Sequence, residues 1–233
     1  MKGLEGKRVV VTGGTSGIGA ATVQRCRDEG ARVAALADRD VEDPGLACDV
    51  ADAEQVARAF ARVDELLGGV DVLIANAGIS IRKPFLEIEE ADWQRVLDVN
   101  LTGVFHCAQQ AERRMVAGDG GVILMTASTN GLTGLAFYAD YNASKAGVIL
   151  LAKTMALELA PKVRVNSVCP GYVLTPMQRA EYSDQMLAEV NAGIPLGRHA
   201  APEEIAALYA FLASDEGAYF TGATISIDGG ETA

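Results

Sequence analysis

A tyrosine and a lysine four positions apart, Tyr141 and Lys145, are the residues of this sequence best suited by type and spacing to proton transfer. The segment 146–160 is apolar, with one glycine and no proline, which predicts a helix. Side chains four positions apart lie on one face of a helix, so the phenol and the ammonium should stand side by side. An ammonium within about 4–6 Å favours the phenolate, and we expect it to lower the tyrosine's pKa from its usual value of about 10. Ser128, thirteen positions before the tyrosine, supplies a hydroxyl for a substrate oxygen. The alternative is a surface Tyr–Lys pair on an amphipathic helix.

A glycine-rich turn stands between the first expected strand, residues 8–11, and the first expected helix, which ends near Gly30. Its glycines, Gly13, Gly17 and Gly19, would let the backbone approach a pyrophosphate, and the start of the following helix favours negative charge. The spacing is G-x-x-x-G-x-G rather than the common G-x-G-x-x-G. A glycine turn alone can be a simple connector, but its place between strand and helix predicts a dinucleotide site.

The second expected strand, residues 32–37, is followed by Asp38. An acidic residue about 20 positions beyond the glycines can bind the adenosine ribose hydroxyls and repel a 2′-phosphate. Arg39 could instead attract that phosphate, although the glycine turn itself contains no lysine or arginine. We therefore predict NAD in preference to NADP. The alternative is that Asp38 and Arg39 are ordinary solvated charges in a turn.

The elements that must position these residues alternate along the chain. Further strands are expected at 46–48, 70–75, 122–126, 163–168 and 223–227, with helices at 52–67, 91–116 and 202–213. This alternation, without a linker or repeat, predicts one α/β domain over residues 1–233 with a mainly parallel sheet. The segment 174–197 is the least regular, and we expect it to hold one short helix and to cover the substrate.

Two polar positions lack an obvious structural reason. Asn100 lies within an expected helix among apolar neighbours, and a buried amide requires partners, so a functional role is plausible. Asn76, Ala77 and Gly78 follow the fourth strand, where small residues suit a ligand lying across the sheet edge or form a structural turn.

Composition narrows the function classes. The net charge of -11 over 233 residues, without a basic stripe, argues against a nucleic-acid partner. Apolar runs are shorter than the ~18 residues of a membrane span, and the N-terminus runs directly into a strand without room for a signal peptide. Four scattered cysteines suggest reduced thiols and a cytoplasmic location, and two histidines without clustered ligands make a metal site unexpected.

The motifs together resemble the short-chain dehydrogenase/reductase family over essentially the whole chain. They are Thr12-Gly13-x-x-x-Gly17-Ile18-Gly19, Asn76-Ala77-Gly78, Asn100, Ser128, Tyr141-x-x-x-Lys145 and Pro170-Gly171-x-x-x-Thr175. The resemblance implies a Rossmann-like, doubly wound sheet of seven strands, with NAD or NADP across its carboxyl edge.

It also implies catalytic roles. Tyr141 would be the acid/base, Ser128 would hold the substrate carbonyl or hydroxyl, and Lys145 would lower the tyrosine pKa and bind the nicotinamide ribose. Asn100 would anchor a water that continues the proton relay. Tyr138 lies seven positions before Lys145 and so cannot fill the motif.

The implied cofactor site is larger. Asp49 and Val50 would meet the adenine, and Val173 and Thr175 the carboxamide side of the nicotinamide. In members that use NAD the acidic residue often lies one position earlier, where this chain has Ala37. The complete predicted cofactor site is Gly13, Ser16, Gly17, Ile18, Gly19, Asp38, Asp49, Val50, Asn76, Ala77, Gly78, Tyr141, Lys145, Pro170, Gly171, Val173 and Thr175.

The expected function is therefore an NAD(P)-dependent oxidoreductase that interconverts a secondary alcohol and its ketone. A 3-oxoacyl-thioester reductase and a dehydrogenase for a polyol, sugar or cyclic diol stay open within the family. A dinucleotide-sensing protein without chemistry is the alternative from another class, against which the intact set of four catalytic residues counts. By resemblance, a homotetramer is expected, assembled through the helices that carry Asn100 and Tyr141 and through the last strand.

Overall fold

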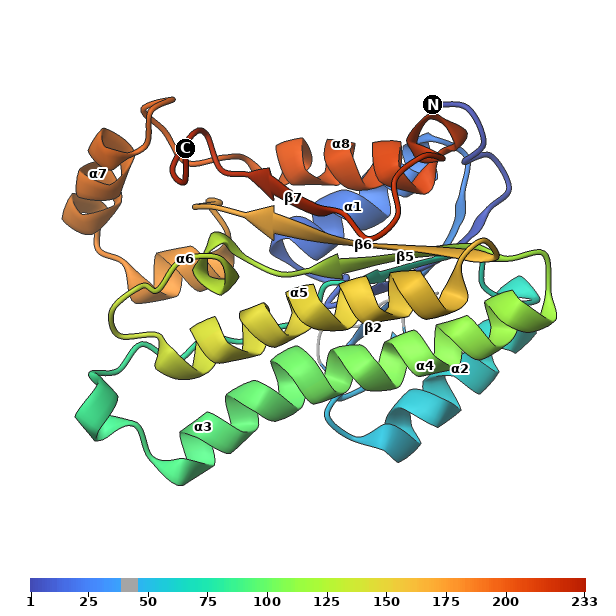
Figure 1. Cartoon of the computed structure of the whole chain (residues 1–233), viewed down its shortest axis with the longest axis horizontal. Helices are drawn as coiled ribbons and strands as arrows, with labels where there is room; N and C mark the ends of the chain where they lie inside the picture. The colour runs from blue at the N-terminus through green and yellow to red at the C-terminus, as the bar shows by residue number, and fades with distance from the viewer. Residues whose placement is uncertain (39–45) are drawn as a thin grey trace.

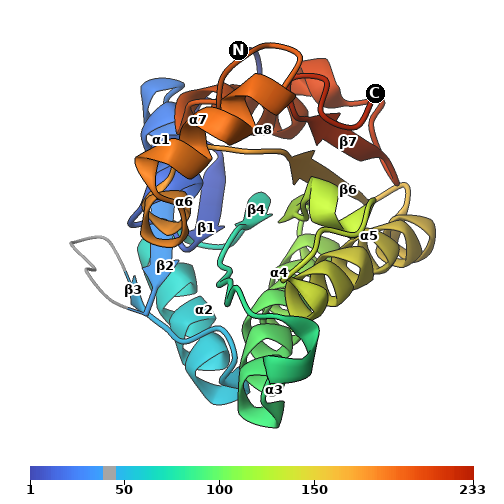
Figure 2. The same cartoon turned by 90° about the vertical axis from the view of Figure 1, so that its left-hand side faces the viewer.

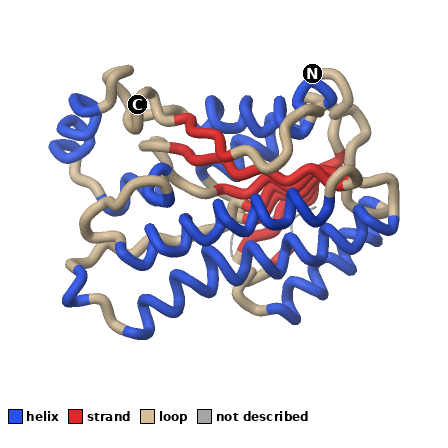
Figure 3. Tube along the Cα trace, in the orientation of Figure 1, coloured by secondary structure: helices blue, strands red, loops and turns tan. Residues whose placement is uncertain are grey.

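The computed structural model describes residues 1–38 and 46–233, and its centre is a seven-stranded parallel sheet. The strands are β1 (Arg8–Thr12), β2 (Arg32–Ala37), β3 (Leu46–Ala47), β4 (Val72–Ala75), β5 (Gly121–Thr126), β6 (Val163–Pro170) and β7 (Thr224–Ile227). Their order across the sheet is β3-β2-β1-β4-β5-β6-β7, and the strands are the red segments of Figure 3. The predicted Rossmann-like, doubly wound fold is confirmed.

Helices cover both faces of the sheet (Figures 1 and 2). On one face lie α1 (Gly17–Asp28) and α8 (Pro202–Ala213), and on the other lie α2 (Ala53–Leu67), α4 (Gly103–Ala117) and α5 (Ala139–Leu159). Strands buried on both faces are expected to be continuously apolar, and residues 9–11 of β1 and all of β4 are buried. Two apolar cores result, one on each side of the sheet.

Most boundaries follow local signals in the sequence. Helix α2 begins after Asp52, whose carboxylate accepts hydrogen bonds from the backbone N–H groups of Glu54 and Gln55, at 2.9 and 3.1 Å. Strand β6 extends beyond the predicted range to Pro170. Proline has no N–H to donate, but the N–H of the next residue, Gly171, donates to the Ile227 carbonyl at 3.1 Å and continues the pairing with β7.

The helix predicted at 91–116 has an irregular centre. A π-helical turn, Asp98–Thr102, joins α3 (Glu90–Leu97) to α4, and Asn100 lies in this turn. Turns of this kind insert an extra residue into a helix and often lie at functional sites.

The segment 174–197 contains two helices rather than the one that we expected, α6 (Pro176–Glu181) and α7 (Asp184–Gly193). Each has its own N-cap: Thr175 Oγ1 accepts from Gln178 N, and Ser183 Oγ accepts from Met186 N, both at 3.3 Å. Tyr182 between them is extended, with φ -120°, and interrupts the helix. Three-residue 3₁₀ turns lie at Phe85–Glu87, Thr129–Gly131 and Asp215–Gly217.

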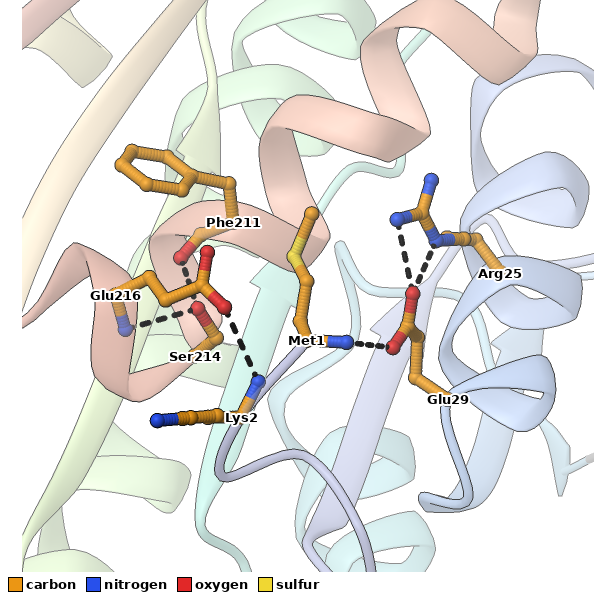
Figure 4. A network of polar contacts seen from close by, with 7 residues as sticks. All are labelled: Met1, Lys2, Arg25, Glu29, Phe211, Ser214 and Glu216. Atoms are coloured by element: carbon orange, nitrogen blue, oxygen red, sulfur yellow. Dashed lines mark hydrogen bonds and ion pairs between the residues drawn. The ribbon is translucent and has the colours of Figure 1, made fainter.

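The strand arrows in Figure 1 point toward α6 and α7, whereas residues 1–2 lie at the opposite end of the sheet. There a polar network ties the first residues to two distant elements (Figure 4). The Met1 ammonium pairs with Glu29, which also pairs with Arg25 at 2.9 Å, and Lys2 N donates to Glu216 Oε1 at 3.2 Å. This network secures α1 and the turn after α8 to one another, and the carboxyl edge of the sheet is left for ligands.

Candidate active site

The larger cavity lies at the carboxyl edge of the sheet, between the ends of β1 and β4. From β1 the chain continues to β2 and β3 on one side, and from β4 it continues to β5, β6 and β7 on the other side. Ligands of open parallel sheets bind at the point where the strand order reverses in this way. The cavity has a volume of about 250 Å³. It is lined by the glycine turn, the ends of β2 and β4, and residues brought from α5 and α6.

The glycine turn has the conformation that close ligand approach requires. Gly13 and Gly17 have φ of +63° and +51°, which side chains rarely adopt. A Cβ on Gly13 would lie 2.9 Å from Ala77 Cα, and one on Gly17 would lie 3.2 Å from the Thr175 side chain. Helix α1 begins at Gly17, so its free N–H groups open at the cavity. The turn therefore fits a pyrophosphate.

Asn76 and Ala77 are fixed to the neighbouring strand. Thr12 Oγ1 accepts from both of their backbone N–H groups, at 2.9 and 3.0 Å, and the Asn76 amide donates to the Thr12 carbonyl at 3.1 Å. These hydrogen bonds fix the end of β4 to the end of β1 beside the cavity. Asn76 therefore stabilises the backbone here as well as lining the cavity.

Lys145 is buried, with 2 % of its surface exposed, and its Nζ donates to the Thr126 carbonyl at 2.8 Å. Burial lowers the pKa of this ammonium to about 8. Its Nζ lies 5.5 Å from the centre of the Tyr141 ring. The predicted side-by-side placement of the two residues is therefore present.

The prediction that this ammonium lowers the tyrosine pKa is not met in the structure as it stands. Burial raises the pKa of Tyr141 to about 12, the hydrogen bond with Ser128 opposes this rise, and Glu181 adds to it. Lys145 faces the tyrosine's ring and donates its hydrogen bond to the Thr126 carbonyl, so desolvation of the phenol dominates. With its pKa raised, Tyr141 is neutral near pH 7 and can donate its proton.

Asn100 is fully buried and its amide is fully engaged. Its Oδ1 accepts from Ile79 N at 2.8 Å, and its Nδ2 donates to the Ile79 carbonyl at 2.9 Å and to Ser144 Oγ at 3.2 Å. Ser144 Oγ in turn donates to the Tyr141 carbonyl at 2.7 Å. The side chain thus joins the segment after β4 to the start of α5, and it acts here as a positioning residue.

Most of the predicted cofactor residues line the larger cavity. They are Gly13, Ser16, Gly17, Ile18, Asp38, Asp49, Val50, Asn76, Ala77, Gly78, Tyr141, Lys145 and Thr175. Arg39, which we weighed against Asp38, lies outside the described residues.

Four predicted residues do not line this cavity. A Cβ on Gly19 would lie 2.0 Å from the Gly13 carbonyl oxygen, so this glycine permits packing inside the turn. Pro170 ends β6, Val173 is buried beside Ala200, and Gly171 lines a second cavity instead. The family motifs therefore identify segments that lie near the cavity, but not every residue of these segments lines it.

Several lining residues were not among the predicted cofactor residues, although Met177 was expected to line the substrate pocket. They are Thr15, Ala37, Cys48, Ile79, Arg95, Val99, Thr126, Pro176 and Met177. Arg95 is the most informative, because its guanidinium pairs with Asp49 at 3.0 Å from the far side of the cavity. This pair could not be predicted because the two residues lie far apart in the sequence. Ala37 and Thr126, in contrast, lie at the ends of predicted strands, and that position could have identified them as lining residues.

The second cavity, of about 80 Å³, shares two lining residues with the first, Tyr141 and Met177. Ser128 lies on its wall, as do Tyr138 and Glu181. The Tyr138 hydroxyl donates to Glu181 Oε2 at 2.8 Å, and burial together with this bond raises the pKa of Tyr138. Tyr138 is thus a neutral wall residue, in agreement with its exclusion from the Tyr-x-x-x-Lys motif.

The described residues contain no group of three or more His, Cys, Asp or Glu side chains that could hold a metal ion. Within the same ranges, every helix is too short or too polar to span a membrane.

A fold and a site of this kind define a nicotinamide-dependent oxidoreductase, and comparison with known proteins agrees. The family model described as enoyl-(acyl carrier protein) reductase matches residues 13–232. The chain is 41% identical over 239 residues to cis-4-hydroxycyclohexanecarboxylate dehydrogenase of Sinomonas cyclohexanicum, with 96% of each covered. It is 40% identical to the 3-oxoacyl-[acyl-carrier-protein] reductase FabG of Thermotoga maritima, covering 97% of this chain and 98% of the relative.

Among solved structures, a short-chain type dehydrogenase/reductase from Mycobacterium marinum superimposes with a TM-score of 0.93 at 39% identity, covering 99% of this chain and 97% of that one. The chain belongs to the short-chain dehydrogenase/reductase family, as its motifs indicated. It is an oxidoreductase whose family binds a nicotinamide dinucleotide.

Proposed function

We propose that this protein oxidises a secondary alcohol to its ketone, or catalyses the reverse reaction, with Tyr141 as the acid/base. The observation that carries the proposal is that this tyrosine lines both cavities. The larger cavity fits a dinucleotide, and the smaller one is the right place for a substrate carbon that faces the nicotinamide. We assign residues 1–233 to one domain, with 174–197 as its substrate segment.

A bound nicotinamide dinucleotide supplies or accepts the hydride. The protein's own residues then handle the oxygen and the proton. Ser128 would donate a hydrogen bond to the substrate oxygen, and Tyr141, neutral because of its raised pKa, would give its proton to that oxygen during reduction. Lys145 lines the dinucleotide cavity beside Tyr141, where its buried ammonium can bind the ribose and return a proton to the phenolate.

We propose NAD rather than NADP as the cofactor. Asp38 lies on the wall of the dinucleotide cavity at the end of β2, where a carboxylate binds ribose hydroxyls and repels an added phosphate. Turnover with NAD and NADP at equal concentration tests this: NAD should give the higher kcat/KM, and Asp38→Ser should raise kcat/KM with NADP relative to NAD. Higher turnover of the unsubstituted protein with NADP would overturn the assignment.

The decisive experiment for the reaction is Tyr141→Phe. It should abolish nicotinamide-dependent absorbance change with a panel of secondary alcohols and ketones, because general acid–base help of about 10²–10⁴-fold is lost. Dinucleotide affinity, measured by calorimetry, should persist. Tyr219→Phe, a change at a fully exposed ring, is the matched control and should retain full activity. An active Tyr141→Phe variant would contradict the assignment, and inactivity of the unsubstituted protein with every substrate would favour the dinucleotide-sensing alternative.

Assembly and location complete the proposal. We propose a homotetramer in the cytoplasm, supported by exposed Leu150 and Leu157 on α5, whose side chains leave an apolar surface for a partner helix. Four buried free cysteines suit a reducing compartment. Light scattering tests the assembly, and a monomer would contradict it.

A further inference from the structure

The smaller cavity combines apolar rings with many hydrogen-bonding groups. It is much smaller than the ~300–1,000 Å³ that drug-sized ligands occupy. Its apolar lining is Leu135, Met177 and the rings of four tyrosines, whose hydroxyls join the amide, hydroxyl and carboxylate groups of the other lining residues. Of the described residues that line it, two are carboxylates, Glu181 and Glu231, and none is lysine or arginine.

Glu231 is held at this cavity by a well-formed turn after β7. Asp228 accepts hydrogen bonds from the backbone N–H groups of Gly230 and Thr232, at 3.0 and 3.1 Å. Glu231 Oε2 lies so close to Gly171 that a Cβ there would approach it to 2.5 Å. The missing side chain of Gly171 thus leaves the space in which this carboxylate lies.

The Glu231 carboxylate is incompletely satisfied. The Thr129 hydroxyl donates to Glu231 Oε2, but at a long 3.5 Å. Burial and the neighbouring Asp228 raise its pKa, so the charged form gains from any further donor. A substrate hydroxyl is a donor of the required kind.

Gln178 supplies the complementary group. Its Nε2 is buried and, within residues 1–38 and 46–233, has no hydrogen-bond partner, although the side chain lines the same cavity. A buried donor without an acceptor costs free energy that a ligand oxygen would recover. The cavity therefore offers an acceptor and a donor at once, and an alcohol hydroxyl both donates and accepts.

We infer that the substrate is a small, uncharged, polyhydroxylated alcohol, in which hydroxyls next to the reacting carbon donate to Glu231 and accept from Gln178. This inference rests on the proposed function and narrows it. The two carboxylates disfavour an anionic substrate at the same site, since like charges repel in a partly buried cavity. Glu181, already bound by the Tyr138 hydroxyl, contributes mainly charge.

The test compares three alcohols of four carbons: erythritol, sec-butanol and β-hydroxybutyrate, each with saturating dinucleotide. We expect kcat/KM for erythritol to exceed that for each of the others at least about 10-fold, because a site built to bind hydroxyls discriminates against analogues that lack them. Glu231→Gln should reduce the erythritol to sec-butanol ratio of kcat/KM about 10-fold, mainly by raising KM for erythritol. Gln178→Met should reduce the same ratio, and Glu203→Gln, at an exposed position of α8, is the matched control.

The outcomes separate the two levels of the argument. Loss of erythritol preference in both variants, with the control unaffected, supports the inference. Equal use of erythritol and sec-butanol, a preference for β-hydroxybutyrate, or an unchanged ratio in both variants overturns it, while the proposed oxidoreductase reaction stands. No oxidation of any of the three alcohols with either NAD or NADP overturns the inference, and the proposed reaction is overturned as well only if the wider panel of secondary alcohols and ketones is also unreactive.

Discussion

Lys145→Met should change how the stability of the protein depends on pH, because this ammonium is buried and, among residues 1–38 and 46–233, no carboxylate pairs with it. Its pKa falls from 10.5 to about 8 on folding, and burial is the main cause. Below pH 8 the group is charged in both the folded and the unfolded chain, so the folded state bears the whole desolvation cost. Between pH 8 and 10.5 the folded state binds fewer protons than the unfolded state, and the free energy of unfolding therefore rises with pH.

The expected size follows from the two pKa values. One pKa unit corresponds to about 1.4 kcal/mol, so the lysine alone should add about 2.5 kcal/mol to the free energy of unfolding between about pH 7 and pH 10. Measurements should stop near pH 10, since tyrosines of the unfolded chain deprotonate above it. The methionine variant lacks this rise. Its stability relative to the unsubstituted protein should therefore be highest at pH 7 and fall by about 2.5 kcal/mol by pH 10.

Urea denaturation followed by circular dichroism at several pH values measures the difference. Lys153→Met, at an exposed lysine farther along α5, is the matched control, and its curve should run parallel to that of the unsubstituted protein. Parallel curves for Lys145→Met would show that the ammonium is not desolvated. A difference of the opposite sign would show that a negative group stabilises its charge, and either result would refute the reasoning.

Two further predictions concern residues beside this lysine. In the ligand-free protein, the phenolate absorbance of the unsubstituted protein minus that of Tyr141→Phe should not titrate below pH 10, because burial raises the pKa of Tyr141 to about 12; a midpoint near pH 8 would contradict this. Asn100→Ala should lower the free energy of unfolding by about 2–4 kcal/mol, since the backbone N–H and carbonyl of Ile79 both lose their partner. Asn191→Ala, at a half-buried amide bonded to His199, should cost less than Asn100→Ala, and equal losses on urea denaturation would count against the special position of Asn100.

The sheet was predictable because its signals are local. An apolar run such as residues 32–37 predicts a strand, and an N-cap such as Asp52 predicts the start of a helix, each within a few positions. The two helices of the segment 174–197 were merged because Ser183 was not recognised as an N-cap, although its Oγ accepts from Met186 N. The π turn has no sequence signature beyond the isolated Asn100.

The candidate site was predictable as a set of residues but not as an electrostatic environment. Four-residue spacing places Lys145 beside Tyr141, yet it does not reveal that the ammonium binds the Thr126 carbonyl or that burial outweighs the charge. The meeting of Gln178 and Glu231 at one cavity depends on folding of segments more than fifty positions apart, and periodicity carries no information about it.

The extra residue in Asp98–Thr102 makes the long helix a composite of two registers. Each residue turns an α-helix by about 100°, so removing Val99 would restore an unbroken backbone ladder and at the same time rotate one half of the rod relative to the other. Either Asn100 would lose its hydrogen bonds to Ile79, or the apolar side chains of α4 would no longer pack on the sheet. A one-residue deletion at this place would thus restore the regularity of the helix and disrupt the hydrogen bonds that join Asn100, Ser144 and Tyr141.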